Sequence, residues 1–212
     1  NTGEIEMKIR LAALLACMAL SAPLAAQQFD TISFGVDGGY PPFDVLAPSG
    51  EITGFDIDIA NALCTQLKAK CVFVKQPFES MIAALNAHKF DAIIASLNIT
   101  DERKKEVDFT DRYYRSAAQL VARKGSPLLP DVASLKGKTV GVQTGSTHEA
   151  FAKANWANHG VKIVGYANQD NVYLDLLSGR IDAALQDNIQ AATGFIDTPR
   201  GQKFAFAGPE IG

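Results

Sequence analysis

The chain has 212 residues, with 20 lysines and arginines against 23 aspartates and glutamates, and its formal net charge is −3. A mildly negative balance without a basic run argues against nucleic acid as a partner. The length is sufficient for one medium domain or two small lobes with a buried core.

Residues 7–26 have the pattern of a secretory signal peptide, with a basic start, an apolar core at 11–20 and small residues before Gln27. The apolar core is shorter than the roughly 20 residues that cross a bilayer, which argues against a membrane anchor. A lipoprotein cleavage site at Cys17 would leave a very short apolar core, so we prefer cleavage before Gln27. Residues 1–6 precede the first methionine and lie outside the predicted fold.

The first half of the mature chain alternates predicted strands and helices. Strands are expected at 31–37, 71–74 and 91–95, and helices at 56–69 and 80–87. Pro41 and Pro42 exclude a helix from the loop at 38–43. The sequence T-D-E at 100–102 is typical of a helix start. A strand at 116–123 is long enough to leave this lobe.

The same alternation follows a connecting stretch at 124–138, which carries prolines and glycines. Strands are expected at 139–142, 161–165, 181–185 and 203–207, and helices at 147–157, 171–178 and 189–195. This order predicts two α/β lobes with largely parallel sheets, in which ligands bind beyond the carboxyl ends of the strands.

An internal repeat supports two similar lobes. Residues 85–94 read L-N-A-H-K-F-D-A-I-I and residues 176–185 read L-L-S-G-R-I-D-A-A-L, so both fit L-x-x-x-[KR]-[FI]-D-A-x-[IL]. Upstream of each copy, G-V-D-G-G at 35–39 parallels G-V-Q-T-G at 141–145. Two lobes of this kind would enclose a cleft.

Two cysteines, Cys64 and Cys71, remain after removal of the signal peptide. In an exported protein this pair indicates a disulfide between the end of a helix and the next strand, and two free thiols are the alternative. A metal site is disfavoured, because no Cys or His pair with ligand spacing lies nearby. His88, His148 and His159 are far apart in the sequence.

Polar residues follow the predicted strands at the expected cleft. Asp37 ends the first strand, and Ser96 and Asn98 follow the strand of the first repeat copy. Ser96 and Asp187 occupy equivalent positions, since each lies five residues after the aspartate of its repeat copy. Asp187 and Ser96 are expected to bind an ammonium group, and Asp37 a second cation at the far end of the ligand.

An anion site is predicted beside them. Arg103 lies in the first turn of a predicted helix, where a cation opposes the helix dipole, and this local misfit suggests that it binds a carboxylate. Thr147 begins another helix, whose free N–H groups favour an anion. Tyr40 and Phe78 could lie on either side of an aliphatic or cationic ligand side chain.

Each of these residues also has a plainer interpretation. Tyr40 and Phe78 could be core aromatics, Arg103 a solvated surface charge, and Asp187 a cap for the helix that follows it. Asp56 could bind the second cation with Asp37, but we prefer to interpret it as the N-cap of its own helix.

Several short motifs together resemble those of a known family. They are G-Y-P-P-F at 39–43, G-F-D-I-D at 54–58, D-A-I-I at 91–94, I-T-D-E-R at 99–103, L-K-G-K at 135–138, G-V-Q-T-G-S-T at 141–147 and G-R-I-D-A at 179–183. Over residues 29–212 the chain resembles the periplasmic amino-acid-binding proteins of ABC importers (solute-binding protein family 3). It is closest to their lysine/arginine/ornithine- and histidine-binding group.

The resemblance implies a bilobal α/β periplasmic-binding-protein fold of the Venus-flytrap type (type II), with lobes at 27–117 and 118–210 joined by hinge strands. It implies a periplasmic, non-enzymatic monomer that needs no cofactor or metal and docks on a membrane permease. Cys64 and Cys71 match a disulfide of the group. Family members continue through a C-terminal segment, so completion of the first lobe is expected beyond residue 212.

By position, the resemblance supports the roles already given to Asp37, Tyr40, Phe78, Ser96, Arg103, Thr147 and Asp187. Three departures concern specificity. Ala95 stands where the group often has a second serine, and Asn98 replaces a serine that would touch the amino-acid head of the ligand. Gln143 and His148 stand at a variable rim.

The expected function is capture of a cationic L-amino acid of the lysine, arginine, ornithine or histidine class for an ABC transporter. The alternatives are binding of another amino acid or an opine-like derivative, the sensor module of a receptor, and a dehydratase-like enzyme on the same fold. An enzyme needs a buried general acid or base, whereas Asp37 and Asp187 are better explained by cations of a ligand.

Overall fold

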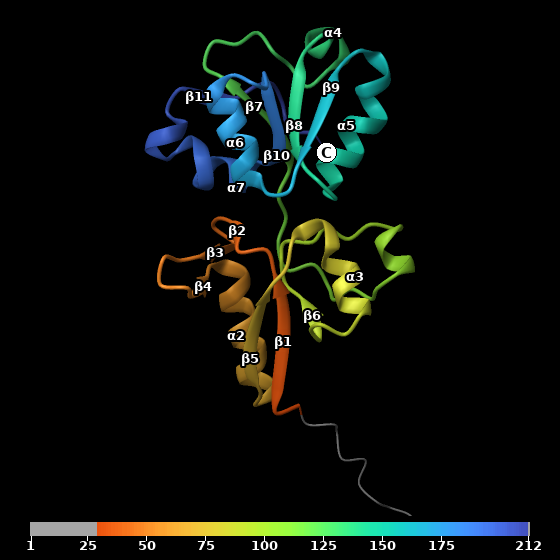
Figure 1. Cartoon of the computed structure of the whole chain (residues 1–212), viewed down its shortest axis with the longest axis vertical. Coiled ribbons are helices and arrows are strands. Elements are labelled where there is room, and N and C mark those ends of the chain that lie inside the picture. The colour runs from red at the N-terminus through yellow and green to blue at the C-terminus, as the bar shows by residue number, and fades with distance from the viewer. Residues whose placement is uncertain (1–28, 212) are drawn as a thin grey trace, which may run out of the picture.

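The computed structural model describes residues 29–211, so the predicted signal peptide at 7–26 lies outside the described residues. The two α/β lobes that the sequence predicts are present, and they lie end to end along the long axis (Figure 1). The first contains the elements from β1 to β6 and the second those from β7 to β11.

The first lobe is built on a parallel sheet with the strand order β5-β1-β6. Its strands are β1 (Thr31–Val36), β5 (Lys70–Lys75) and β6 (Ala92–Ile93), and its helices are α2 (Phe55–Leu67) and α3 (Met81–Asn86), with short 3-10 turns η1 (Phe78–Ser80) and η2 (Arg103–Lys105). The helix expected from Thr100 is therefore only a 3-10 turn, in which the Thr100 hydroxyl accepts the N–H of Arg103 at 3.2 Å.

A small antiparallel sheet begins within the loop expected at 38–43. It consists of β2 (Gly39–Tyr40), β3 (Asp44–Leu46) and β4 (Ile52–Thr53), and the Pro41–Pro42 peptide between β2 and β3 is cis. The two prolines do exclude a helix, but they turn the chain into a hairpin beside the end of β1.

The second lobe has a five-stranded sheet in the order β11-β7-β10-β8-β9. Its strands are β7 (Ala118–Arg123), β8 (Thr139–Gln143), β9 (Lys162–Tyr166), β10 (Ala183–Asp187) and β11 (Phe204–Phe206). Its helices are α4 (Val132–Leu135), α5 (Thr147–Asn155), α6 (Gln169–Ser178) and α7 (Asn188–Ala191), with the short turns η3 (Ala157–His159), η4 (Ala192–Ile196, a π turn) and η5 (Pro199–Gly201).

The expectation of largely parallel strands is wrong at one side of this sheet. Strands β8, β9 and β10 are parallel, but β7 is antiparallel to both β10 and β11. The reason is the point at which β7 enters the sheet of the second lobe. Its first residue, Ala118, pairs with Asp187 at the carboxyl end of β10, so β7 runs away from the first lobe while β10 runs toward it.

The sequence repeat corresponds to a packing contact that occurs once in each lobe. A Cβ atom added to Gly35 in β1 would lie 2.5 Å from Cζ of Phe90, and one added to Gly141 in β8 would lie 2.5 Å from Cδ1 of Ile181. The apolar residue of the repeat thus covers a bare backbone position in the neighbouring strand.

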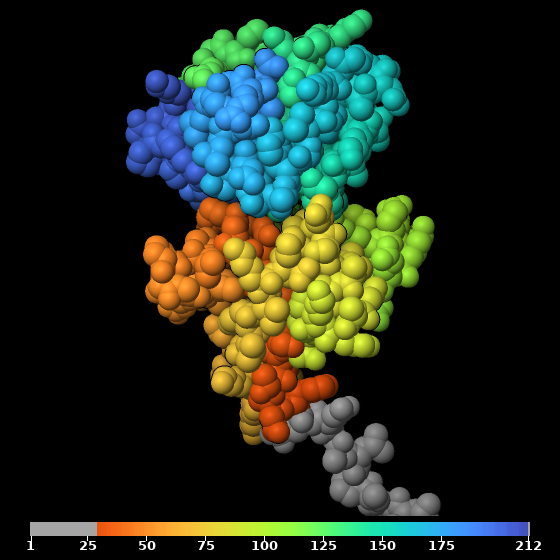
Figure 2. Space-filling view, in the orientation of Figure 1, coloured from red at the N-terminus to blue at the C-terminus, as the bar shows by residue number. Residues whose placement is uncertain are grey.

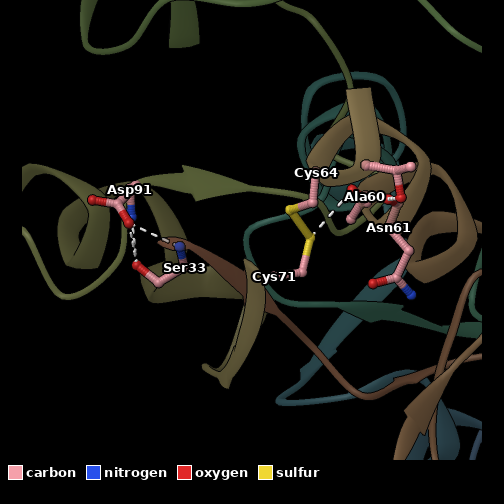
Figure 3. Close-up of a disulfide and its surroundings, with 7 residues drawn as sticks. Ser33, Ala60, Asn61, Cys64, Cys71 and Asp91 are labelled. Carbon is pink, nitrogen blue, oxygen red and sulfur yellow. Dashed lines mark hydrogen bonds between the residues drawn. A yellow bond between two sulfur atoms is a disulfide. The ribbon is translucent and has the colours of Figure 1, made fainter. Parts of the chain in front are cut away.

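The repeated aspartates also make matching hydrogen bonds. Asp91 Oδ2 accepts the backbone N–H of Ser33 at 2.8 Å and its hydroxyl at 2.5 Å (Figure 3). Asp182 Oδ2 accepts the backbone N–H of Thr139 at 2.8 Å. Each aspartate N–H donates to the carbonyl of the same partner residue. The repeat therefore fixes equivalent neighbouring strands in the two lobes.

The predicted disulfide is confirmed, and free thiols are excluded. Cys64 near the end of α2 is bonded to Cys71 in β5, with their Cα atoms 5.9 Å apart (Figure 3). Between residues 29 and 211, no helix has the length and apolar character needed to cross a membrane. The same residues form no group of three or more His, Cys, Asp or Glu side chains suited to a metal ion.

Candidate functional site

A small cavity lies between the lobes, at the carboxyl ends of strands from both sheets. Its volume is about 20 Å³, room for about one water molecule. The surfaces of the two lobes are in contact (Figure 2). The structure brings all the predicted ligand-binding residues to this cavity, and adds Ser146: its lining is Asp37, Tyr40, Phe78, Ala95, Ser96, Asn98, Arg103, Gln143, Ser146, Thr147, His148 and Asp187.

Asp187 provides a negative charge at one side of the cavity. Its Oδ2 accepts the Tyr40 hydroxyl at 2.5 Å, its Oδ1 accepts the Ser116 hydroxyl at 2.6 Å, and His148 Nε2 lies 3.6 Å from Oδ1. Burial by itself raises the pKa of Asp187, but His148 and the two hydroxyls outweigh it and lower that pKa below its usual value. Asp187 occupies the N-cap position of α7 without a capping hydrogen bond, so the cap interpretation does not hold.

Ser96 lies on the other lip of the cavity, held by Asp56. It has a left-handed φ of 53°, and Asp56 Oδ2 accepts both its N–H at 2.8 Å and its hydroxyl at 3.1 Å. Asp56 Oδ1 accepts the Tyr113 hydroxyl at 2.9 Å. Because its hydroxyl donates to Asp56, the Ser96 oxygen keeps lone pairs that can accept from a ligand.

Asp56 itself is not the N-cap that we expected. Gly54 occupies the N-cap position of α2, and no side chain caps the helix. Asp56 lies in the first turn, fully buried, and its partner Ser96 is 40 residues away. No local sequence signal identifies such a contact.

Arg103 provides the positive charge. Its Nη1 donates to the carbonyl of Asn98 at 2.7 Å, and its Nη2 donates across the lobes to the carbonyl of Gly145 at 2.9 Å. The guanidinium carbon lies 5.8 Å from the centre of the Phe78 ring, within cation–π range. Burial lowers the pKa of Arg103. The side chain is therefore part of the lobe interface and not a solvated surface charge.

The amino end of α5 adds to this positive side. Thr147 is its first residue, and Ser146 is its N-cap, whose hydroxyl oxygen accepts the N–H of Glu149 at 3.1 Å. Asn98 Nδ2 reaches from the first lobe to Thr147 Oγ1 at 2.8 Å. The positive end of the helix and the guanidinium thus favour an anion in the same place.

Asp37 lies at the end of the cavity nearest Gln143. It is buried, and its Oδ2 accepts a long hydrogen bond of 3.3 Å from Gln143 Nε2 in the second lobe. Burial raises the pKa of Asp37, and Gln143, the charge of Lys75 and the backbone N–H of Phe78 offset this in part. Within residues 29–211, Asp37 takes part in no ion pair.

The aromatic residues occupy two different environments. Tyr40 is 8% exposed and stacks on Phe43 with ring centres 6.0 Å apart, so it is a core aromatic whose hydroxyl end also reaches the cavity. Phe78 is half-buried at the start of η1. Ala95, two residues after the end of β6, is buried and leaves that part of the lining without a hydroxyl.

Four hydrogen bonds cross between the lobes around the cavity: Tyr40 to Asp187, Asn98 to Thr147, Arg103 to Gly145, and Gln143 to Asp37. A molecule of amino-acid size enters only if this interface opens. The site thus combines a cationic side with two carboxylates, an arrangement that suits a zwitterion carrying a further positive charge.

Comparisons with known proteins agree with this geometry. The family model described as bacterial extracellular solute-binding proteins, family 3, matches residues 32–193. The lysine/arginine/ornithine-binding periplasmic protein of Escherichia coli strain K12 is 45% identical over 207 residues, which are 98% of this chain and 80% of that protein. The histidine-binding periplasmic protein of Salmonella typhimurium is 44% identical over 206 residues, 97% of this chain and 79% of that protein.

Among solved structures, an ancestral arginine-binding protein bound to arginine superposes with a TM-score of 0.82 at 36% identity, covering 87% of this chain and 81% of that one. This similarity confirms the expected bilobal periplasmic-binding-protein fold. The chain belongs to the bacterial extracellular solute-binding proteins of family 3.

Proposed function

We propose that this protein captures a free cationic L-amino acid of the lysine, arginine, ornithine or histidine class and delivers it to an ABC importer. The proposal rests on the environment of the Asp37 carboxylate. Asp37 is a buried carboxylate at one end of the cavity, and among residues 29–211 the one side chain that donates a hydrogen bond to it is Gln143, at a long 3.3 Å. A buried charge needs a partner, and a ligand cation supplies one.

The amino-acid head is assigned to the rest of the cavity. Arg103 and the first turn of α5, beginning at Thr147, bind the ligand carboxylate. Asp187 and the Ser96 oxygen bind its ammonium group, because each carboxylate oxygen of Asp187 can accept more than the one hydroxyl it already holds. Tyr40 and Phe78 flank the ligand side chain.

The protein acts in the periplasm, as the names of its relatives indicate for those proteins. We assign residues 7–26 to a signal peptide that is cleaved on export, and the protein to a monomer that docks on the membrane permease in its closed form. We assign it no catalytic activity. The lowered pKa of Asp187 keeps it ionised at neutral pH, so it is no general acid, and both of its oxygens are already held by the hydroxyls of Tyr40 and Ser116.

The experiment is a thermal-unfolding screen of the purified protein against the twenty amino acids, ornithine and citrulline. A ligand that binds only the folded state stabilises it by RT ln(1 + [L]/Kd), about 4 kcal/mol at 1,000 times Kd. Selective stabilisation by arginine, lysine, ornithine or histidine supports the proposal. A folded protein that no cationic amino acid stabilises contradicts it and favours an opine-like ligand or an enzyme.

A further inference from the structure

Asp44 holds the loop that carries two cavity residues, although it does not line the cavity itself. It lies in β3 and is completely buried. Its Oδ2 accepts the backbone N–H of Asp37 at 3.0 Å, and its Oδ1 accepts the backbone N–H of Tyr40 at 3.1 Å. One carboxylate therefore fixes both ends of the loop.

The two ends of this loop contact the ends of two neighbouring strands of the second lobe, β8 and β10. Asp37 accepts from Gln143, and Tyr40 donates to Asp187. A shift at Asp44 would move the proposed side-chain site and one of the bonds that close the cavity together. Positioning errors of this kind are costly in a recognition site.

Asp44 also has an unusual charge environment. Besides burial, the negative charges of Asp37 and Asp56 raise the pKa of the Asp44 carboxyl. The charge of Asp44 in turn adds to burial in raising the pKa of the Tyr113 and Tyr114 hydroxyls. Lys75 acts on neighbouring Asp37, yet no ion pair within residues 29–211 includes Asp44. The pKa of Asp44 is raised to about 7, mainly by burial and secondly by the negative charge of Asp37.

We propose that Asp44 is a positioning residue that sets the preference for a cationic over a neutral ligand side chain by holding Asp37 and adding negative charge behind it. This rests on the function proposed above. A ligand cation at Asp37 favours the ionised form of Asp44, and that form accepts both backbone N–H groups. Ligand charge and loop position are therefore linked through one buried carboxylate.

A purely structural role for Asp44 makes a different prediction. If Asp44 served only the hairpin, its loss would weaken every ligand to a similar degree. If it acts through Asp37, its loss reduces the affinity for a cationic ligand more than that for a neutral ligand of the same length. Arginine and citrulline form such a pair, because citrulline carries an uncharged ureido group in place of the guanidinium.

The test is calorimetric titration of arginine and citrulline into the wild type and into Asp44→Asn, Asp37→Asn and the double variant. An asparagine at position 44 can accept only one of the two N–H groups, so both ligands lose some affinity through Tyr40, and we expect the arginine-to-citrulline affinity ratio to fall about five-fold. In the Asp37→Asn background, the second substitution should leave the arginine-to-citrulline ratio within about two-fold. Asp58→Asn, an exposed carboxylate on α2, is the matched control and should change neither affinity.

An unchanged arginine-to-citrulline ratio in folded Asp44→Asn overturns the inference while leaving the proposed function intact. A wild-type protein that binds no cationic amino acid overturns both. If Asp44→Asn does not fold, the wild type is titrated near pH 7 in buffers of different ionisation enthalpy. Arginine should then release more protons than citrulline, and equal release contradicts the inference.

Discussion

The hydroxyl of Tyr40 in the first lobe donates a 2.5 Å hydrogen bond to Oδ2 of Asp187, which lies 147 residues later in the second lobe. The other oxygen of Asp187 accepts the hydroxyl of Ser116, in the segment that joins the lobes. One carboxylate thus connects both lobes and the segment between them. Since Asp187 is also the proposed partner of the ligand ammonium, ligand binding and lobe closure involve the same group.

Tyr40→Phe removes this bond and keeps the ring stacked on Phe43. We expect affinity for all amino acids to fall about five- to ten-fold, because one charge-assisted hydrogen bond of the closed form is lost. Calorimetric titration measures the change. Tyr166→Phe is the control, because that hydroxyl donates to Asp175 outside the cavity. If only cationic ligands lost affinity, the substitution would be acting through Asp37 and not through the bond to Asp187.

Arg103→Ala should abolish binding of every amino acid, because one guanidinium binds the carboxylate that all of them share. The expected loss is about a hundred-fold or more, from the ligand contact together with the bond to Gly145 across the lobes. Equilibrium titration with arginine and glutamine measures it. Lys104→Ala, an exposed cation on the same turn, should bind like the wild type. Unchanged affinity in Arg103→Ala would remove this residue from the site.

Asp37→Asn should lower the affinity for arginine and lysine by about ten-fold to a hundred-fold and should hardly change the affinity for citrulline. The reason is that the substitution removes only the charge that faces the side chain of the ligand. Competition titrations with the three ligands measure the difference. The exposed Asp58→Asn controls for the loss of one negative charge. Equal losses for charged and neutral ligands would mean that Asp37 is structural.

Gly194→Ala should favour the open form of the protein. A Cβ atom at Gly194 in η4 would lie 2.8 Å from Cγ of Pro41 in the other lobe and 2.9 Å from Gln190 Nε2. Ligand affinity should fall while the two lobes stay folded, and small-angle scattering should show a larger radius of gyration with saturating arginine than the wild type has. Thr193→Ala, exposed on the same turn, should close normally. Full closure of Gly194→Ala would show that the interface accommodates a methyl group.

The ligand-free protein should lose stability as the pH rises toward neutrality. Burial raises the pKa of Asp37, Asp44 and Asp56, and it raises that of Asp44 from 3.8 to about 7. Between these values the folded protein binds more protons than the unfolded chain, so the free energy of unfolding falls with rising pH. The thermal midpoint should therefore be lower at about pH 7.5 than at about pH 5.5, by roughly 2 to 4 °C for each kcal/mol lost.

In Asp44→Asn this difference in midpoint should shrink, because the titrating group is gone, and in the exposed Asp58→Asn it should persist. Saturating arginine should also reduce the difference, since the ligand cation stabilises the ionised carboxylates. A wild-type midpoint that rises over this pH range would contradict the account of these buried carboxylates.

Much of the site follows from the sequence because the repeat marks equivalent strands. Phe90 over Gly35 and Ile181 over Gly141 form the same contact in each lobe. Once those strands are aligned, the residues beyond their ends fall on the two sides of one cleft, and Ser96 and Asp187 do line the same cavity. Short-range patterns were sufficient here, because both partners lie in repeated segments.

Contacts between unlike segments could not be predicted in this way. Asp56 was expected to cap α2, but it holds Ser96 from 40 residues away. Asp44 carries no local signal, since only the hairpin brings it beneath the N–H groups of Asp37 and Tyr40. The direction of β7 depends on its pairing with β10, which no pattern within either strand reveals.

The measurement that tests the central claim most directly is a crystal structure of the protein grown with arginine. The account predicts the ligand carboxylate within hydrogen-bonding distance of Arg103, its ammonium group beside Asp187 and Ser96, and its guanidinium against Asp37. An arginine bound in the reverse direction, or outside this cavity, would contradict the account.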